Sequence, residues 1–143
     1  MIPTHGSTCA AGYDLYANID EELMIEPLET AKIGTGISLE IVDGCFGAIF
    51  ARSGLATNHG LRPANCVGVI DSDYRGEIIV SIHNDSNSTK RIAPNDRIAQ
   101  LVILPYQTVE FVEVSELSAT QRGDNGFGST DIKHPRFNKN ETL

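Results

Sequence analysis

The chain has 143 residues, of which 41% are hydrophobic and 21% are charged, and its formal net charge is −8. This length predicts one domain with its own core, and the composition is typical of a soluble globular protein. The acidic balance argues against an extended nucleic-acid surface, which would require a basic face. No apolar run approaches the ~20 residues of a membrane-spanning helix.

Cys9, Cys45 and Cys66 are an odd number of cysteines without paired metal-ligand spacing. They are therefore interpreted as reduced thiols of an intracellular protein. The chain begins without a signal-peptide pattern, which agrees with that interpretation. We expect a cytoplasmic protein without a membrane or nucleic-acid partner, located in the host cell if a phage or virus encodes it.

Near the N-terminus, Tyr13, Leu15 and Ala17 alternate with other residues and predict a strand. Asp14 lies on the opposite face of that strand and, taken alone, is interpreted as a surface or sheet-end carboxylate. Residues 19–51 predict several short strands, because glycine and proline interrupt them repeatedly. Within them, residues 37–41 alternate as a half-buried strand does.

Residues 52–60 predict one or two helical turns, with Ser53 as the N-cap and Gly60 as the terminating residue. The free N–H groups at such a helix start, together with the Arg52 side chain, suit a phosphate group. A capped connector without any ligand explains the same residues.

The stretch with the most chemistry is 67–77, which lies between two strand patterns and predicts a β-hairpin. Its tip carries Asp71, Asp73, Tyr74 and Arg75. A solvated polar turn is the simplest alternative. A calcium loop is excluded, because Arg75 and Ile82 stand where two of its ligands would be.

Residues 97–104 form a run that is apolar on both faces, which predicts a central, buried strand. Gln100 interrupts it, and a buried glutamine requires hydrogen-bond partners in the backbone or in a ligand. Residues 119–131 are glycine-rich and carry an arginine, an aromatic ring and two hydroxyl groups. They predict a flexible tail that could close over a phosphate and a planar base. We therefore expect a core at 1–118 and a flexible arm and tail at 119–143.

Five stretches, taken in order, resemble the five motifs of the homotrimeric dUTPase family. They are residues 11–17, Arg52-Ser53-Gly54-Leu55, 68–76, Arg97-Ile98-Ala99-Gln100-Leu101 and 122–130. The resemblance runs from about Pro3 to Thr130. It implies an all-β, jelly-roll-like subunit, a β-sandwich or barrel with at most one short helix, and three subunits that share three active sites.

The resemblance also implies the reaction, in which dUTP is split into dUMP and pyrophosphate by attack of water on the α-phosphorus. Mg²⁺ is expected on the substrate triphosphate, with no direct protein ligand. Asp14 matches a carboxylate that helps to organise the metal–phosphate region through water or an arginine partner. Such an enzyme keeps uracil out of DNA and supplies dUMP for dTMP synthesis. Asp71 matches the general base, and Gln100 matches a second catalytic residue that contacts phosphate or water.

The remaining matches are substrate-binding residues of the family. They are Arg52, Ser53, Gly54, Asn65, Gly68, Tyr74, Ile79, Arg122, Phe127, Gly128, Ser129 and Thr130. Two positions depart from the family pattern: Asn95 stands where glycine is usual, at a turn where asparagine tolerates positive φ, and Asp131 places a negative charge beside the arm.

Two rival functions follow from other readings of the chain. A dCTP deaminase resembles dUTPases in fold, but it carries a catalytic glutamate on the strand after the hairpin, where this chain has Val80-Ser81-Ile82. A nucleotide-sensing or protein-binding jelly roll would use the same pocket without turnover. The five motifs together favour the dUTPase reading over both.

Overall fold

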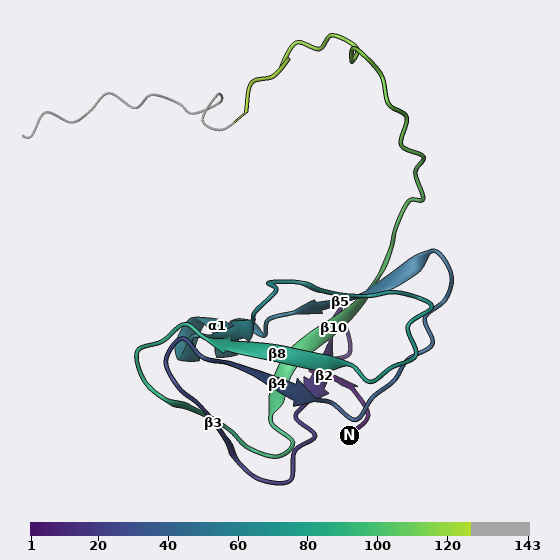
Figure 1. The fold of residues 1–143 in the computed structure, drawn as a ribbon. Helices are drawn as coiled ribbons and strands as arrows, with labels where there is room; N and C mark the ends of the chain where they lie inside the picture. The colour runs from purple at the N-terminus through teal and green to yellow at the C-terminus, as the bar shows by residue number, and fades with distance from the viewer. Residues whose placement is uncertain (127–143) are drawn as a thin grey trace, which may run out of the picture. The chain divides into compact units, whose positions relative to one another are not determined.

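The structure is a computed structural model that describes residues 1–126 (Figure 1). Residues Met1–Val109 form one compact unit, and a second unit begins at Glu110. The first unit consists mainly of strands, and α1 (Ser53–His59) is the only helix within the described residues. The all-β class is confirmed, whereas the expected boundary between residues 118 and 119 stays a prediction.

The largest sheet has five antiparallel strands. Their order is β1 (Thr4–His5), β2 (Tyr13–Tyr16), β10 (Arg97–Pro105), β5 (Cys45–Phe50) and β7 (Gly68–Ile70). The predicted central strand is thus confirmed as β10, which lies between β2 and β5 (Figure 1). Ile98, Ala99 and Leu101 are buried, but Arg97 at the start of the strand is exposed and Ile103 in its second half is 39% exposed.

Two smaller antiparallel sheets complete the unit. One pairs β3 (Leu23–Ile25) with β9 (Lys90–Ile92), and the other has the order β4 (Thr30–Gly34), β8 (Ile79–Asn84) and β6 (Leu61–Pro63). Consecutive strands change sheets, because β6 and β8 belong to one sheet while β7 belongs to the largest sheet. Such crossings are typical of jelly-roll architecture, which agrees with the predicted fold.

The core contains aliphatic side chains from all three sheets. It includes Leu15, Ile25, Ile33, Leu61, Ile82, Ile92 and Ile98, each at most 2% exposed. Branched side chains fill such an interior because they pack densely on pleated strands. Leu15 and Ala17 are buried as their alternation predicts, whereas Tyr13 in the same pattern is 38% exposed.

Two predicted strand features are wrong in the described structure. Residues 37–41 alternate in burial but form no strand, and Ile37 accepts a single backbone hydrogen bond, from Ile78 N–H at 2.8 Å. The hairpin at 67–77 is instead a crossover, because β7 pairs with β5 while β8 pairs with β4 and β6. In both cases the alternation of apolar and polar residues predicts which side chains are buried. It does not predict which strands pair, because pairing depends on segments distant in the sequence.

The helix α1 ends as predicted, because Gly60 adopts φ 69° and its N–H donates to Ala56 O at 3.1 Å. Its predicted start is wrong: Arg52 is the N-cap and Ser53 is the first helical residue. Arg52 supplies its carbonyl to Ala56 N–H, while its side chain turns to Asp14 instead of capping the helix.

Asn95 has φ 65°, as expected for the turn before β10. Cys9, Cys45 and Cys66 are unpaired thiols. Within residues 1–126, no helix is long and apolar enough to cross a membrane.

Candidate active site

Asp14 is the anchor of the first cluster of predicted site residues. Its side chain is 12% exposed, and it accepts hydrogen bonds from Arg52 Nε at 2.8 Å and from an Arg97 terminal nitrogen at 3.3 Å. Arg52 also donates to the Arg97 carbonyl at 3.3 Å. Taken alone in the sequence, Asp14 is interpreted as a surface or sheet-end carboxylate. The structure buries its side chain, and two guanidinium groups neutralise the carboxylate there. Burial of a carboxylate is acceptable only with such partners.

Gln100 lies beside Asp14 in the sheet, because its Cα pairs with Asp14 in β2 and with Phe50 in β5. Its amide nitrogen donates to Ala51 O at 2.8 Å, which fixes the backbone just before α1. Gly12 leaves room for this side chain, since a Cβ at position 12 would lie 2.6 Å from Gln100 Oε1. Gln100 therefore ties the strand end together and still borders the space beside Asp14.

These side chains border a cavity of about 220 Å³, which we call the phosphate pocket. It is lined by Gly6, Ala10, Gly12, Asp14, Arg52, Ser53, Gly54, Arg97 and Gln100. Five of these residues were predicted for the site, and they come from three separate motifs. The structure thus brings together the motifs around Asp14, Arg52 and Gln100.

Arg97 is a site residue that sequence reasoning missed. Strict alternation along β10 places Arg97 and Gln100 on opposite faces. The register between β10 and β2 shifts between Arg97 and Ala99, however, and this bulge directs Arg97 to Asp14. The one signal for Arg97 in the sequence was its place at the start of the motif Arg97-Ile98-Ala99-Gln100-Leu101.

A second cavity of about 180 Å³ lies where β7 and β8 diverge, and we call it the base pocket. It is lined by Ile49, Asn65, Gly68, Val69, Ile70, Ile79, Val80 and Ser81. Three predicted residues, Asn65, Gly68 and Ile79, are among them. Gly68 allows a close approach there, because a Cβ would lie 3.1 Å from that of Ile49. The tight turn before it holds Cys66 at φ 63°.

Asp71 and Tyr74 lie on the exposed crossover between β7 and β8. The crossover is shaped by local hydrogen bonds, from Tyr74 N–H to Asp71 O at 3.1 Å and from the Tyr74 hydroxyl to Glu77 O at 3.0 Å. The ring lies against Gly76, where a Cβ would be 2.6 Å from Tyr74 Cζ. Gly76 therefore permits the observed position of the Tyr74 ring.

The predicted site is divided within this single chain. The phosphate pocket and the base pocket have no lining residue in common among residues 1–126, and Asp71 lines neither of them. Arg122 lies in the second unit, in a local turn where its Nε donates to Asn125 O at 2.9 Å. Phe127, Gly128, Ser129 and Thr130 lie outside the described residues.

The described residues offer few side-chain ligands for a metal ion. Within residues 1–126, no group of three or more His, Cys, Asp or Glu side chains is arranged to hold a metal ion. Asp14 is the carboxylate of the phosphate pocket, and both of its oxygens accept hydrogen bonds from arginine. One carboxylate of this kind fits Mg²⁺ that takes most of its oxygens from phosphate and water.

A family model described as dUTPase matches residues 1–131. The chain belongs to the dUTPase family. The deoxyuridine 5'-triphosphate nucleotidohydrolase of Desulfitobacterium hafniense (strain DSM 10664 / DCB-2) is 48% identical over 132 residues, which are 92% of this chain and 87% of that protein. The protein of the same name from Anaplasma marginale is 45% identical over 129 residues, which are 90% of this chain and 88% of that protein.

Solved structures agree with this membership. The dUTPase of Staphylococcus bacteriophage 80alpha, solved with dUpNHpp, has a TM-score of 0.83 and 30% identity and covers 92% of each chain. The dUTPase from phage phi11 of S. aureus has a TM-score of 0.74 and 27% identity, and the match covers 84% of this chain and 92% of that one. A mutant of the phi11 enzyme was solved to describe a structural Mg(II) ion.

Proposed function

We propose that this protein hydrolyses dUTP to dUMP and pyrophosphate by attack of water on the α-phosphorus. The observation that carries the proposal is the phosphate pocket, where Arg52, Arg97 and Gln100 converge around the buried Asp14. Phosphoryl transfer depends on positioning and charge neutralisation more than on covalent help from the protein. Two guanidinium groups in a fixed orientation provide both.

In this proposal, the triphosphate binds to Arg52, Ser53, Gly54 and Gln100. The ion pair with Asp14 fixes the Arg52 guanidinium before substrate arrives, so little of its freedom is lost on binding. The Gln100 amide is fixed in the same way by Ala51 O. Mg²⁺, when bound through the triphosphate, neutralises phosphate charge, and Asp14 contacts its water shell.

The base pocket selects uracil by the backbone groups of β7 together with Asn65. A fixed pattern of N–H and C=O groups leaves a mismatched base with unpaired buried groups, which costs more than a lost contact. Tyr74 packs against the deoxyribose and leaves no room for a 2′-hydroxyl group. Its ring is held for this role by Gly76 and by the hydrogen bond to Glu77 O.

Asp71 is the general base that orients and deprotonates the attacking water. It lies on the crossover beside the base pocket, directly after β7. An exposed carboxylate of this kind can approach a water molecule held between the two ends of the substrate. General base catalysis requires hydrogen-bond contact with that water, which closure of the site supplies.

The protein acts as a homotrimer with sites shared between subunits. The separation of the two pockets in one chain supports this, because a substrate needs both at once. A further cleft of about 500 Å³ is lined by apolar side chains that include Ile2, Val42 and Ile103. Ile2 is 83% exposed and Val42 70% exposed, as expected for a surface that another subunit covers.

The segment from Arg122 to Thr130 closes the site over base and γ-phosphate in this proposal. The enzyme acts in the cytoplasm, where DNA precursors are made. There it keeps uracil out of DNA and supplies dUMP for dTMP synthesis.

The test is incubation of the full chain with dUTP and Mg²⁺, with pyrophosphate release as the measurement and dCTP, dTTP and UTP alongside. We expect release from dUTP and little from the others. Ammonia release from dCTP would instead support a deaminase. Binding of dUTP without pyrophosphate release would support a nucleotide-sensing module.

A further inference from the structure

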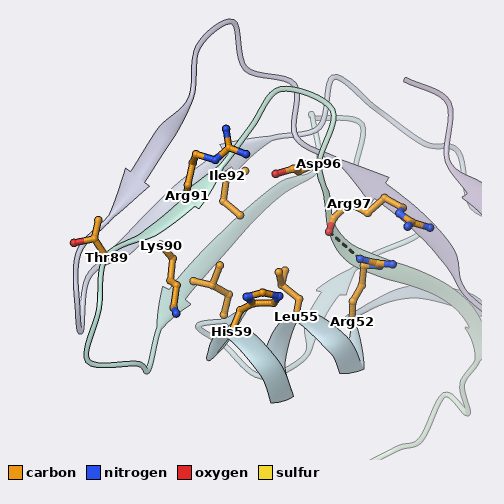
Figure 2. A pocket seen from close by; sticks show the side chains of 10 residues that line it. Arg52, Leu55, His59, Thr89, Lys90, Arg91, Ile92, Asp96 and Arg97 are labelled. Atoms are coloured by element: carbon orange, nitrogen blue, oxygen red, sulfur yellow. Dashed lines mark hydrogen bonds between the residues drawn. The ribbon is translucent and has the colours of Figure 1, made fainter.

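A second cavity with charged walls adjoins the phosphate pocket in the first unit. This cavity has a volume of about 450 Å³ and lies between α1, β9 and the start of β10, so we call it the α1–β9 cavity (Figure 2). It shares Arg52 and Arg97 with the phosphate pocket. Its other cationic residues, Lys90 and Arg91, belong to none of the five dUTPase motifs.

The lining of the α1–β9 cavity is rich in cationic side chains for a protein with a net charge of −8. Arg52, Lys90, Arg91 and Arg97 line it together with one carboxylate, that of Asp96. Three of these cations pair with carboxylates outside the lining, Arg52 and Arg97 with Asp14 and Arg91 with Glu22. Asp96 also accepts a hydrogen bond from Ala93 N–H at 2.8 Å, which shapes the turn before β10. A local concentration of cations on an acidic surface attracts anions to that place.

Two of these cations are available to a ligand. Lys90 is half-buried and makes no ion pair within residues 1–126, and Figure 2 shows its side chain extending towards α1, where His59 lies. Arg91 pairs with Glu22, but both side chains are more than half exposed, at 57% and 52%. Exposed pairs of this kind are weak, so an incoming anion can replace Glu22.

We propose that the α1–β9 cavity is a second anion site, which binds a polyphosphate group. That group is either free, as in pyrophosphate or tripolyphosphate, or the phosphate chain of a nucleotide. The volume is in the range of ligand pockets, and arginine and lysine are the usual partners of phosphate oxygens. Leu55 and Ile92 form an apolar wall between the charged groups.

Occupancy of this site also affects the phosphate pocket. Because Arg52 and Arg97 line both cavities, anions bound in the two cavities lie close together and repel each other. A polyphosphate in the α1–β9 cavity therefore weakens substrate binding, and substrate weakens polyphosphate binding by the same factor. This coupling rests on the proposed function, whereas the binding itself does not.

The direct test is calorimetric titration of the full chain with tripolyphosphate at low ionic strength and without Mg²⁺, in wild type, Lys90→Glu and Lys32→Glu. Lys32 is the matched control, because it is an exposed lysine of β4 outside the cavity and the charge change is identical. We expect Lys90→Glu to lower the affinity about tenfold or more, as for loss of a charged hydrogen bond. Lys32→Glu should change it by about twofold or less.

Equal losses in the two variants, or no binding to wild type, would overturn the proposal. Turnover of dUTP without added polyphosphate should be the same in Lys90→Glu as in wild type, so a failure of the proposed function remains distinguishable. The same titration with dATP separates the two sources: tighter binding than tripolyphosphate identifies a nucleotide, and weaker binding identifies a free polyphosphate.

A second measurement repeats the titration with the catalytic site saturated by dUpNHpp. Tripolyphosphate should still bind once per chain. Its affinity should fall as the dUpNHpp concentration is raised and should then stay constant once the catalytic site is saturated. Complete exclusion without a plateau would show that both ligands use one site, and the α1–β9 cavity would then have no separate ligand.

Discussion

The phosphate pocket and the crossover at 71–77 are built in opposite ways. In the pocket, each functional side chain is held by a partner from a distant segment: Asp14 by Arg52 and Arg97, and Gln100 by Ala51. In the crossover, the hydrogen bonds are local, and Asp71 and Tyr74 are exposed. The side chains of the phosphate pocket are thus fixed by contacts within one chain. Asp71, the proposed base, has no such contacts within residues 1–126 and would gain them from another subunit or from substrate.

This difference has a consequence for catalysis. A preorganised cluster of cations can hold a triphosphate without further rearrangement. An exposed carboxylate activates water effectively only once the site is closed and most of the solvent is excluded. We therefore expect changes in the crossover to affect turnover, and changes in the pocket to affect substrate affinity and stability.

The largest effect is expected for Asp71→Asn, which keeps the shape of the side chain but cannot accept a proton. Turnover of dUTP should fall by roughly 10²-fold or more, the usual contribution of a general base. Binding of dUpNHpp, measured by calorimetry, should be largely unchanged. Asp73→Asn is the matched control two residues away, and a larger loss there would move the role of base to Asp73.

A smaller and different effect is expected for Asp14→Asn. The change removes the charge that pairs with Arg52 and Arg97, so both guanidinium groups lose their orientation. The KM for dUTP should rise about tenfold, and the free energy of unfolding should fall by about 1–2 kcal/mol, as for loss of charged hydrogen bonds. Asp20→Asn, at an exposed position, should change neither. An unchanged KM would show that Asp14 has no part in substrate binding.

Gly12→Ala tests the position of Gln100 without changing any functional group. The added methyl group would collide with Gln100 Oε1 and displace the amide from Ala51 O. We expect kcat/KM to fall about fivefold, within the range for a misplaced polar contact. Gly6→Ala is the control on the same pocket, since a Cβ at Gly6 meets nothing within 4 Å. Equal losses in the two variants would show that the position of Gln100 does not affect kcat/KM.

The last change concerns the choice of sugar. Tyr74→Ala should raise the activity on UTP relative to dUTP by roughly threefold to tenfold, because steric exclusion of one group is worth modest discrimination. Competition assays with both nucleotides measure the ratio directly. If the ratio stays at the wild-type value, another residue excludes the 2′-hydroxyl group.

Much of this arrangement was predictable from the sequence, and the failures have physical causes. Local signals located β2, β10 and the end of α1, because strand alternation and the positive φ of Gly60 act within a few residues. The family resemblance predicted five of the nine residues that line the phosphate pocket and three of the eight that line the base pocket. The pairing of β7 with β5 could not be inferred, since it depends on a segment about 20 residues earlier in the chain.

Arg97 shows the same limit at the level of one side chain. Its contact with Asp14 requires a bulge in the register of β10. The alternation of apolar and polar residues does not predict where a bulge occurs. Likewise, the burial of Asp14 follows from two arginines that are distant in sequence. Ion pairs across a sheet are properties of the folded chain and become visible only there.

The central claim is that a complete site combines the phosphate pocket of one copy with Asp71 of another. Two variants test it: Asp71→Asn, which keeps the pocket, and Arg52→Ala, which keeps Asp71. Each alone should be nearly inactive when dUTP is held near the wild-type KM, the first through loss of the base and the second through loss of substrate affinity. After unfolding and co-refolding in equal amounts, random assortment gives about a quarter of the sites an intact pocket and an intact Asp71 from different chains. Activity should therefore return to about a quarter of wild type, provided that sites act independently. If mixed oligomers are verified by mass and remain no more active than their parents, both groups belong to the same chain and the claim is wrong.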